Sequence, residues 1–238
     1  MDYFAKLTAK NGRNSLPYNP CQLLDFSLLA LSAGENSAGE TGEREMVAVL
    51  LGGRATVQAG NQTFENNGER ETVFSGKPHA VYLPAGISYT ITAVTNVQIA
   101  LPSAPSDFIT EPYHIKPNQV ISGIWGADNH TRYYNQILVE SVQPELPAKR
   151  RIVGETFTPS GNWSTYPAHK HEEDNLPHEA YHEEMYYFRV TPDDGFGIIR
   201  FYRDEGEATN YTVQDNSILM LPHGYHTYVV APGFQSYY

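Results

Sequence analysis

The chain has 238 residues, of which 40% are hydrophobic and 18% are charged. This composition allows a buried core and excludes a disordered tail. The 16 basic side chains against 27 acidic ones give a formal net charge of -11, and the densest basic cluster is only residues 149–151. That balance disfavours nucleic-acid binding, which needs a positive face to displace counterions from phosphates.

The N-terminal region indicates the compartment. Cys21 is the single cysteine, so no intramolecular disulfide can form, which fits a reducing environment. Residues 1–6 contain no apolar core of signal-peptide length. The apolar stretch 22–31 is interrupted by Asp25 and is too short to span a bilayer. We therefore expect a cytoplasmic protein with no membrane partner.

The first half of the sequence predicts short strands joined by turns. Its 17 tyrosines, 19 glycines and 16 prolines, counted over the whole chain, favour this pattern over long helices. We find no convincing amphipathic helix longer than about three turns. Pro102 and Pro105 are expected to end the last strand of this half. Strands are predicted at residues 46–51, 55–59, 81–83, 88–93 and 97–101.

The second half repeats the rhythm of the first. Its strands are predicted at residues 151–157, 184–190, 196–202, 217–221 and 227–230. A Leu-Pro-x-Gly turn occurs in both halves, at residues 83–86 and 221–224. Two copies of one β-barrel unit explain this repeat, because short strands must close or stack to hide their edges. We place the barrels at residues 1–120 and 121–238.

A cluster of candidate metal ligands lies in the second half. His169 and His171 are two residues apart, so on a strand both imidazoles point to one face. Glu184 begins a tyrosine-rich strand, and His226 follows the Leu-Pro turn. Three imidazoles and one carboxylate suit Zn²⁺, Fe²⁺, Mn²⁺, Co²⁺ or Ni²⁺, with open positions left for substrate. The alternative is that these are solvated histidines beside the acidic run 172–174.

The order H-x-H, Glu, then His after a proline turn looks like the metal motif of the cupin superfamily. The string Gly161–Asn175, which reads GNWSTYPAHKHEEDN, is more specific. It resembles the 5-deoxy-glucuronate isomerase family and, more distantly, the 4-deoxy-L-threo-5-hexosulose-uronate isomerases. The resemblance covers nearly the whole chain. It extends over residues 76–78, 82–84, 104–106, 154–155, 183–187, 195–197, 222–226 and 231–233.

The resemblance implies an all-β bicupin, with two jelly-roll-like β-barrels in tandem. It implies one divalent metal, with Zn preferred and Mn, Fe, Co or Ni as alternatives. The implied reaction, part of myo-inositol catabolism, is an aldose–ketose isomerisation of 5-deoxy-D-glucuronate to 2-deoxy-5-keto-D-gluconate. The expected partners are this small sugar acid and further copies of the chain in a homo-oligomer. The implied metal ligands are His169, His171, Glu184 and His226.

Several residues are candidates for acid–base work. Tyr186 lies two positions from Glu184, so strand alternation places it on the ligand face and Glu183 on the opposite face. Glu183 nevertheless stays open as a rival ligand, because the loop 175–182 exceeds a typical cupin spacing. Tyr186 and Tyr225 are candidate proton donors. The candidate general bases are Glu172, Asp174 and Glu183.

The substrate carboxylate calls for a cation. Arg200 matches an arginine of the family pattern and is the first candidate, since a guanidinium fork suits a carboxylate. Lys170 and Arg151 are alternatives. Aromatic candidates for the pocket lining are Trp163, Tyr166, Tyr186 and Tyr187.

Two departures from the family and two rival functions stand beside this interpretation. The family usually runs further than Tyr238, so we expect a weakened barrel or oligomer. The first half has no H-x-H motif, and Glu45 and His79 cannot form a three-histidine site, so this barrel is predicted to be structural. The rivals are a cupin metal-dependent dioxygenase, which would consume O₂, and a non-catalytic sugar-binding bicupin.

Overall fold

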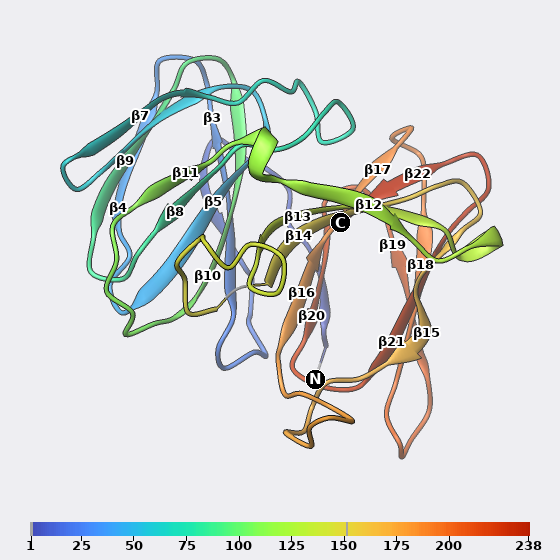
Figure 1. Ribbon diagram of the computed structural model, residues 1–238. Helices are drawn as coiled ribbons and strands as arrows, with labels where there is room; N and C mark the ends of the chain where they lie inside the picture. The colour runs from blue at the N-terminus through green and yellow to red at the C-terminus, as the bar shows by residue number, and fades with distance from the viewer. Residues whose placement is uncertain (1, 151) are drawn as a thin grey trace.

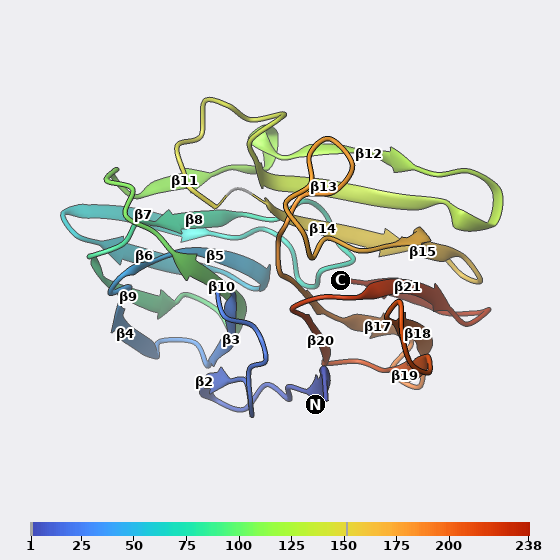
Figure 2. The ribbon, with the colours of Figure 1, turned by 90° about the horizontal axis from the view of Figure 1, so that it is seen from below.

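The computed structural model describes residues 2–150 and 152–238. Two halves built of strands lie side by side (Figures 1 and 2). Within the described residues the only helical segments are two 3₁₀ turns, η1 (Pro117–Gln119) and η2 (Asp128–His130). The prediction of an all-β fold is confirmed. No helix of the described part is long and apolar enough to cross a membrane.

The first half consists of two antiparallel sheets. One has six strands in the order β11-β8-β5-β10-β3-β2, and the other has four in the order β4-β9-β6-β7. Their strands are β2 (Gly12–Ser15), β3 (Asp25–Leu31), β4 (Asn36–Glu40), β5 (Arg44–Gly52), β6 (Ala55–Ala59), β7 (Gln62–Asn67), β8 (Ala80–Leu83), β9 (Ser88–Ala93), β10 (Val97–Pro105) and β11 (Tyr113–Ile115).

The second half contains three sheets. Their strand orders are β12-β13-β14-β22-β17, β15-β21-β18-β19 and β1-β20-β16. Their strands are β1 (Phe4–Lys6), β12 (Ile121–Trp125), β13 (Arg132–Val139), β14 (Ile152–Thr158), β15 (Trp163–His169), β16 (Glu184–Tyr187), β17 (Arg189–Thr191), β18 (Gly197–Tyr202), β19 (Thr209–Val213), β20 (Ser217–Leu221), β21 (Tyr225–Val230) and β22 (Gln235–Tyr237).

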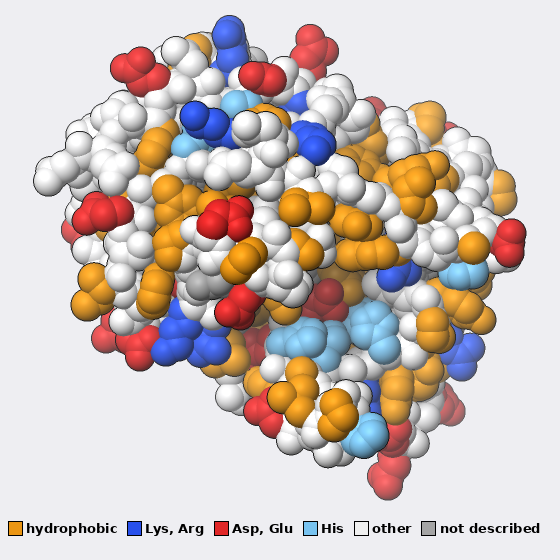
Figure 3. Space-filling model, viewed as in Figure 1, with side chains coloured by type: hydrophobic (Ala, Val, Ile, Leu, Met, Phe, Trp, Pro, Cys, Tyr) orange, Lys and Arg blue, Asp and Glu red, His pale blue; other side chains and the backbone are white. Residues whose placement is uncertain are grey.

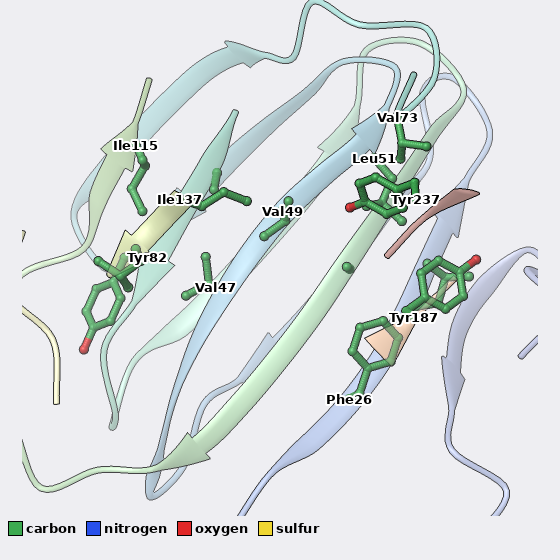
Figure 4. Close-up of a cluster of buried hydrophobic side chains, with 14 of the residues drawn as sticks. Phe26, Val47, Val49, Leu51, Val73, Tyr82, Ile115, Ile137, Tyr187 and Tyr237 are labelled. Carbon is green, nitrogen blue, oxygen red and sulfur yellow. The ribbon is translucent and has the colours of Figure 1, made fainter. Parts of the chain in front are cut away.

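Strand β5 is apolar over residues 46–51, and both of its faces are buried there. Met46 and Leu50 point into the core between the two sheets of the first half. Val47 and Val49, on the opposite face, pack into a second core that joins the two halves (Figure 4). Strand alternation therefore turns one continuous apolar run into two packed surfaces.

Strand β20 plays the same part in the second half. Met220 faces the core between the halves, whereas Leu219 and Leu221 face the interior of the second barrel. Its partner β16 alternates in the same way. Tyr187 packs in the core between the halves, and Tyr186 packs in the interior of the second barrel. The strand that begins with Glu184 is thus held between two packed cores, which fixes its position.

Two further contacts cross between the halves. Strand β1 pairs with β20, so the N-terminal segment lies against the second half, as both ribbon views show. Arg70 and Glu155 form a buried ion pair with 2.5 Å between Nη2 and Oε1. The division of the chain at residue 120 stays a prediction.

The strand predictions were wrong in two places. Strand β10 does not end at Pro102 but continues to Pro105, with Pro102 opposite Phe26 of β3. The predicted strand 184–190 divides at Phe188, because the chain there leaves β20 and begins to pair with β22. Arg151, which was expected to begin a strand, lies outside the described residues.

Candidate metal centre

The four predicted ligands converge. One ligand atom from each of four side chains lies within 4.8 Å of the other three. Figure 3 shows histidine side chains gathered in a hollow at the lower centre of the view. One detail of the prediction was wrong, because β15 ends at the first histidine of the H-x-H pair and the second follows the strand. The converging residues are His169, His171, Glu184 and His226.

The three imidazoles are oriented by backbone carbonyls. The Nδ1 atom of His171 lies 2.5 Å from the carbonyl oxygen of His182. The Nδ1 atoms of His169 and His226 lie 3.3 Å and 3.4 Å from the carbonyl oxygens two residues before them. A carbonyl can only accept, so each Nδ1 carries the proton and donates it. Nε2, once it has no proton, is then the nitrogen that can bind a cation, as in metal sites whose histidines are positioned by a carbonyl or carboxylate.

The Glu184 carboxylate lies between two of these nitrogens. Its Oε2 atom is 2.9 Å from His171 Nε2 and 3.2 Å from His226 Nε2. Burial opposes its ionisation, but the hydrogen bonds from His171 and His226 outweigh burial and lower the pKa of Glu184. The carboxylate is therefore anionic at neutral pH.

The pKa values of two histidines move in opposite directions. Burial lowers the pKa of His169, and the neighbouring His226 lowers it further. Burial also acts to lower the pKa of His171, but its hydrogen bond to Glu184 outweighs that effect and raises it.

Three nitrogen donors and one anionic oxygen within 4.8 Å fit a divalent cation, whose bonds to such atoms are about 2 Å long.

Glu183, the rival ligand, is occupied elsewhere. It is 6% exposed, and its carboxylate accepts hydrogen bonds from three consecutive backbone amides, of residues 22–24, at 2.6, 2.7 and 2.9 Å. Strand alternation turns it away from the cluster that Glu184 joins. Glu183 therefore fixes the N-terminal segment against the second half.

Tyr186 reaches the cluster. Its hydroxyl lies 3.1 Å from Nε2 of His226, and its ring centroid lies 4.6 Å from that of Tyr238. Burial, followed by the nearby Glu184 charge, raises the pKa of Tyr186 well above its usual value. The phenol therefore keeps its proton and can act as a donor.

The structure does not bring Arg200 to the cluster. Ile199 and Phe201, its neighbours on β18, point into the core, and the exposed Arg200 side chain lies on the opposite face beside the Tyr202 ring. The predicted role of Arg200 in substrate binding therefore finds no support. Lys170 is engaged in ion pairs with Glu172 and Asp204 at 3.0 and 3.2 Å. Arg151 lies outside the described residues.

The remaining acid–base candidates stabilise loops. Glu172 accepts a hydrogen bond from the backbone amide of Gly224 at 2.9 Å, which joins the H-x-H segment to the Leu-Pro turn. Asp174 accepts one from the amide of Tyr181 at 3.0 Å. Tyr225 stacks on Tyr202 with 5.0 Å between ring centroids. These contacts stabilise the loops that carry the clustered histidines.

The aromatic residues that were predicted to line the pocket lie in different parts of the structure. Trp163 and Tyr166 lie near each other, with ring centroids 6.1 Å apart, and Tyr166 also contacts His130. Tyr187 instead faces the core between the halves and stacks on Phe26. Alternation along β16 allows only one of Tyr186 and Tyr187 to face the cluster.

Sequence reasoning missed other residues near the cluster. The His182 ring stacks on His171, with 4.0 Å between centroids and 13° between planes. The aromatic ring of Tyr238 lies over Tyr186. The doublet Tyr237–Tyr238 was a local signal, because adjacent residues of an extended chain point to opposite faces, and the two rings do pack into different cores.

The fold and the donor cluster together define a bicupin with a candidate metal centre in the second barrel. Its structure resembles that of an oxalate decarboxylase from Lactobacillus farciminis solved with formate, with a TM-score of 0.67 and 11% identity over 100% of this chain and 86% of that one. At this identity the likeness shows the fold alone, and it confirms the predicted bicupin architecture.

Sequence comparison defines the family. Residues 8–238 match the KduI/IolB family, and the chain belongs to it. It is 37% identical over 219 residues to 5-deoxy-glucuronate isomerase of Geobacillus thermodenitrificans, covering 91% of this chain and 78% of that protein. The Bacillus subtilis strain 168 enzyme of the same name is 35% identical. An IolB-like protein of Salmonella typhimurium superposes with a TM-score of 0.92 and 29% identity, over 100% and 91% of the two chains.

Proposed function

We propose that this protein is a 5-deoxy-glucuronate isomerase of myo-inositol catabolism, which converts 5-deoxy-D-glucuronate to 2-deoxy-5-keto-D-gluconate. The observation that carries the proposal is the convergence of four ligand atoms within 4.8 Å, in a chain 35–37% identical to enzymes of that name. The reaction moves a proton from the carbon beside the aldehyde to the former aldehyde carbon. The charge that develops on the substrate oxygens must be stabilised.

His169, His171, Glu184 and His226 would hold the divalent metal, with Zn preferred and Mn, Fe, Co and Ni as alternatives. When bound, such a cation supplies a Lewis acid for the oxygens that gain charge. The contacts between the three histidines and backbone carbonyls support this role, because they fix the orientation of each imidazole ring without requiring a cation.

Tyr186 would donate a hydrogen bond to the substrate. Its hydroxyl lies beside His226 and its raised pKa keeps it protonated, so it can donate a hydrogen bond to a substrate oxygen as that oxygen becomes negative. The rings of the buried Phe188 and the partly buried Tyr238 pack against the Tyr186 ring and shield it from water. A buried hydrogen bond of this kind strengthens as charge develops.

The test combines metal analysis with a turnover assay. The purified protein is expected to contain a divalent metal and to consume 5-deoxy-D-glucuronate without O₂. Chelation should remove activity, and added metal should restore it. Activity that persists after complete metal removal would overturn the proposed mechanism. O₂ consumption would favour the dioxygenase, and binding without turnover would favour the non-catalytic bicupin.

A further inference from the structure

We propose that Arg132 binds the carboxylate of the sugar acid, and thereby selects an acidic substrate over a neutral sugar. This inference rests on the proposed function and names the cation that recognises the charged end of the substrate. Four features of the structure carry it: the face of the sheet on which Arg132 lies, its closeness to the cluster, its free guanidinium edge, and its attachment to the strand of His169.

The face of the sheet comes from strand alternation on β13. Tyr133 is opposite Phe157, which is itself opposite Tyr237, and both of these partners pack toward the core between the halves. The neighbouring positions must therefore face the interior of the second barrel. Arg132 and its cross-strand partner Trp125 occupy those positions.

The interior position brings Arg132 near the cluster. Tyr238, the neighbour of Tyr237, faces inward and packs on Tyr186. Tyr134, two residues along β13 from Arg132, is opposite Thr156, and Thr156 exchanges backbone hydrogen bonds with Tyr238 at 2.8 and 2.9 Å. Arg132 therefore lies on the face of the sheet that carries Tyr238, and Tyr238 packs on the tyrosine whose hydroxyl contacts His226.

Arg132 is half-buried, and none of the ion pairs between described residues includes it. The central carbon of its guanidinium lies 5.5 Å from the centroid of the Trp125 ring. Contact with an aromatic ring supports the guanidinium while its five N–H donors stay available at the edge. By contrast, Arg70 and Arg189 are paired with Glu155 and Asp215. A supported cation with a free donor edge fits a ligand carboxylate.

The segment before Arg132 is attached to the strand that carries His169. The amide of Thr131 donates a hydrogen bond to Oδ1 of Asn162 at 3.2 Å. The ring of His130 lies 5.7 Å from that of Tyr166 on β15. These contacts hold Arg132 at a fixed distance from the candidate ligands. A residue that binds one end of a substrate needs such a fixed position, because the other end must reach the reacting groups.

The experiment compares Arg132→Gln and Arg132→Lys with the control Arg200→Gln, in metal-loaded protein. Arg200 provides a matched control because its guanidinium lies exposed on the outer face of β18. For 5-deoxy-D-glucuronate, we expect Arg132→Gln to raise KM and lower kcat/KM by about 10- to 100-fold, as loss of a charge-assisted hydrogen bond implies. Arg132→Lys should recover part of this loss, and Arg200→Gln should match the wild type. Metal content should be equal in all four proteins.

A binding assay separates this inference from the proposed function. D-glucuronate and D-glucose differ at C6 by a carboxylate against a hydroxymethyl group, and calorimetry measures their binding without turnover. The wild type and Arg200→Gln should prefer D-glucuronate, and Arg132→Gln should lose that preference. Failure of wild-type turnover with this pattern intact would reject the isomerase but not Arg132. An unchanged preference in Arg132→Gln, or no preference in the wild type, would overturn the role of Arg132.

Discussion

His171 and Glu184 meet across 2.9 Å, between Nε2 and Oε2, although an exposed loop separates them in the chain. The same imidazole is held from its other side, where Nδ1 donates to the carbonyl of His182 within that loop. The loop therefore positions the histidine and leads directly into the strand that provides the carboxylate. Two ligands of the proposed centre are thus fixed by one short segment.

Replacement of His171 by alanine should abolish metal binding and turnover together. The substitution removes one of four donors and leaves the Glu184 carboxylate with His226 alone, so the affinity for a cation should fall steeply. The metal content of the purified variant and its isomerase rate measure the effect. His178→Ala, in the exposed part of the same loop, is the control and should keep both. A His171→Ala protein with normal metal content would remove this residue from the centre.

The adjacent glutamates should separate metal binding from stability. Glu184→Gln replaces an anionic ligand and should lose metal while the fold is kept. Glu183→Gln should keep its metal but lower the free energy of unfolding by about 1.5–3 kcal/mol, because three backbone amides lose a charged acceptor. Metal analysis and urea unfolding of both variants test this. The reverse pattern would make Glu183 the ligand.

Local sequence pattern predicted part of the strand set, and the residue types suggested four candidate ligands that the fold brings together. The continuous apolar run 46–51 and the alternating run 88–93 can each be recognised from neighbouring residues alone. Strands β5 and β9 contain these runs. The candidate ligands could be proposed because three histidines and a glutamate at such spacing are an uncommon combination. The preference for Glu184 over Glu183 came from the cupin resemblance, and alternation added only that the two side chains point to opposite faces.

The substrate side of the site could not be read in the same way. Arg200 has a position on an alternating strand, but which face is inward depends on how β18 pairs with β21. Arg132 lies on a strand of another sheet, and only the pairing of β13 with β12 and β14 turns it inward. Such long-range register is a property of the assembled barrel and leaves no local signal.

Removal of the Tyr186 hydroxyl should reduce turnover without removing metal. Tyr186→Phe keeps the ring that packs on Phe188 and Tyr238, so the fold should be intact. Loss of a proton donor should lower kcat by about 100-fold or more. Tyr187→Phe is the matched control, since that hydroxyl donates to Asn216 at 2.5 Å and its ring faces the core between the halves. Equal kcat values in the two variants would exclude Tyr186 from proton transfer.

The first barrel contains a histidine pair that should make its stability depend on pH. Nδ1 of His79 lies 2.9 Å from Nε2 of His114. Burial, followed by the charges of His79 and Lys116, lowers the pKa of His114 to about 4, against about 6.5 in an unfolded chain. Between these two values the unfolded chain binds a proton that the folded chain does not. The free energy of unfolding should therefore fall as the pH decreases from about 6.5 toward 4.

Urea unfolding at a series of pH values, with chelator present throughout, measures this dependence separately from metal release. His114→Gln cannot take up the proton in either state, so its stability should fall less steeply than that of the wild type over the same range. The contributions of the histidines in the second barrel are common to both proteins and cancel in the difference. Identical pH profiles would show that His114 titrates alike in the folded and unfolded chains, and that burial in the first barrel does not hold it neutral.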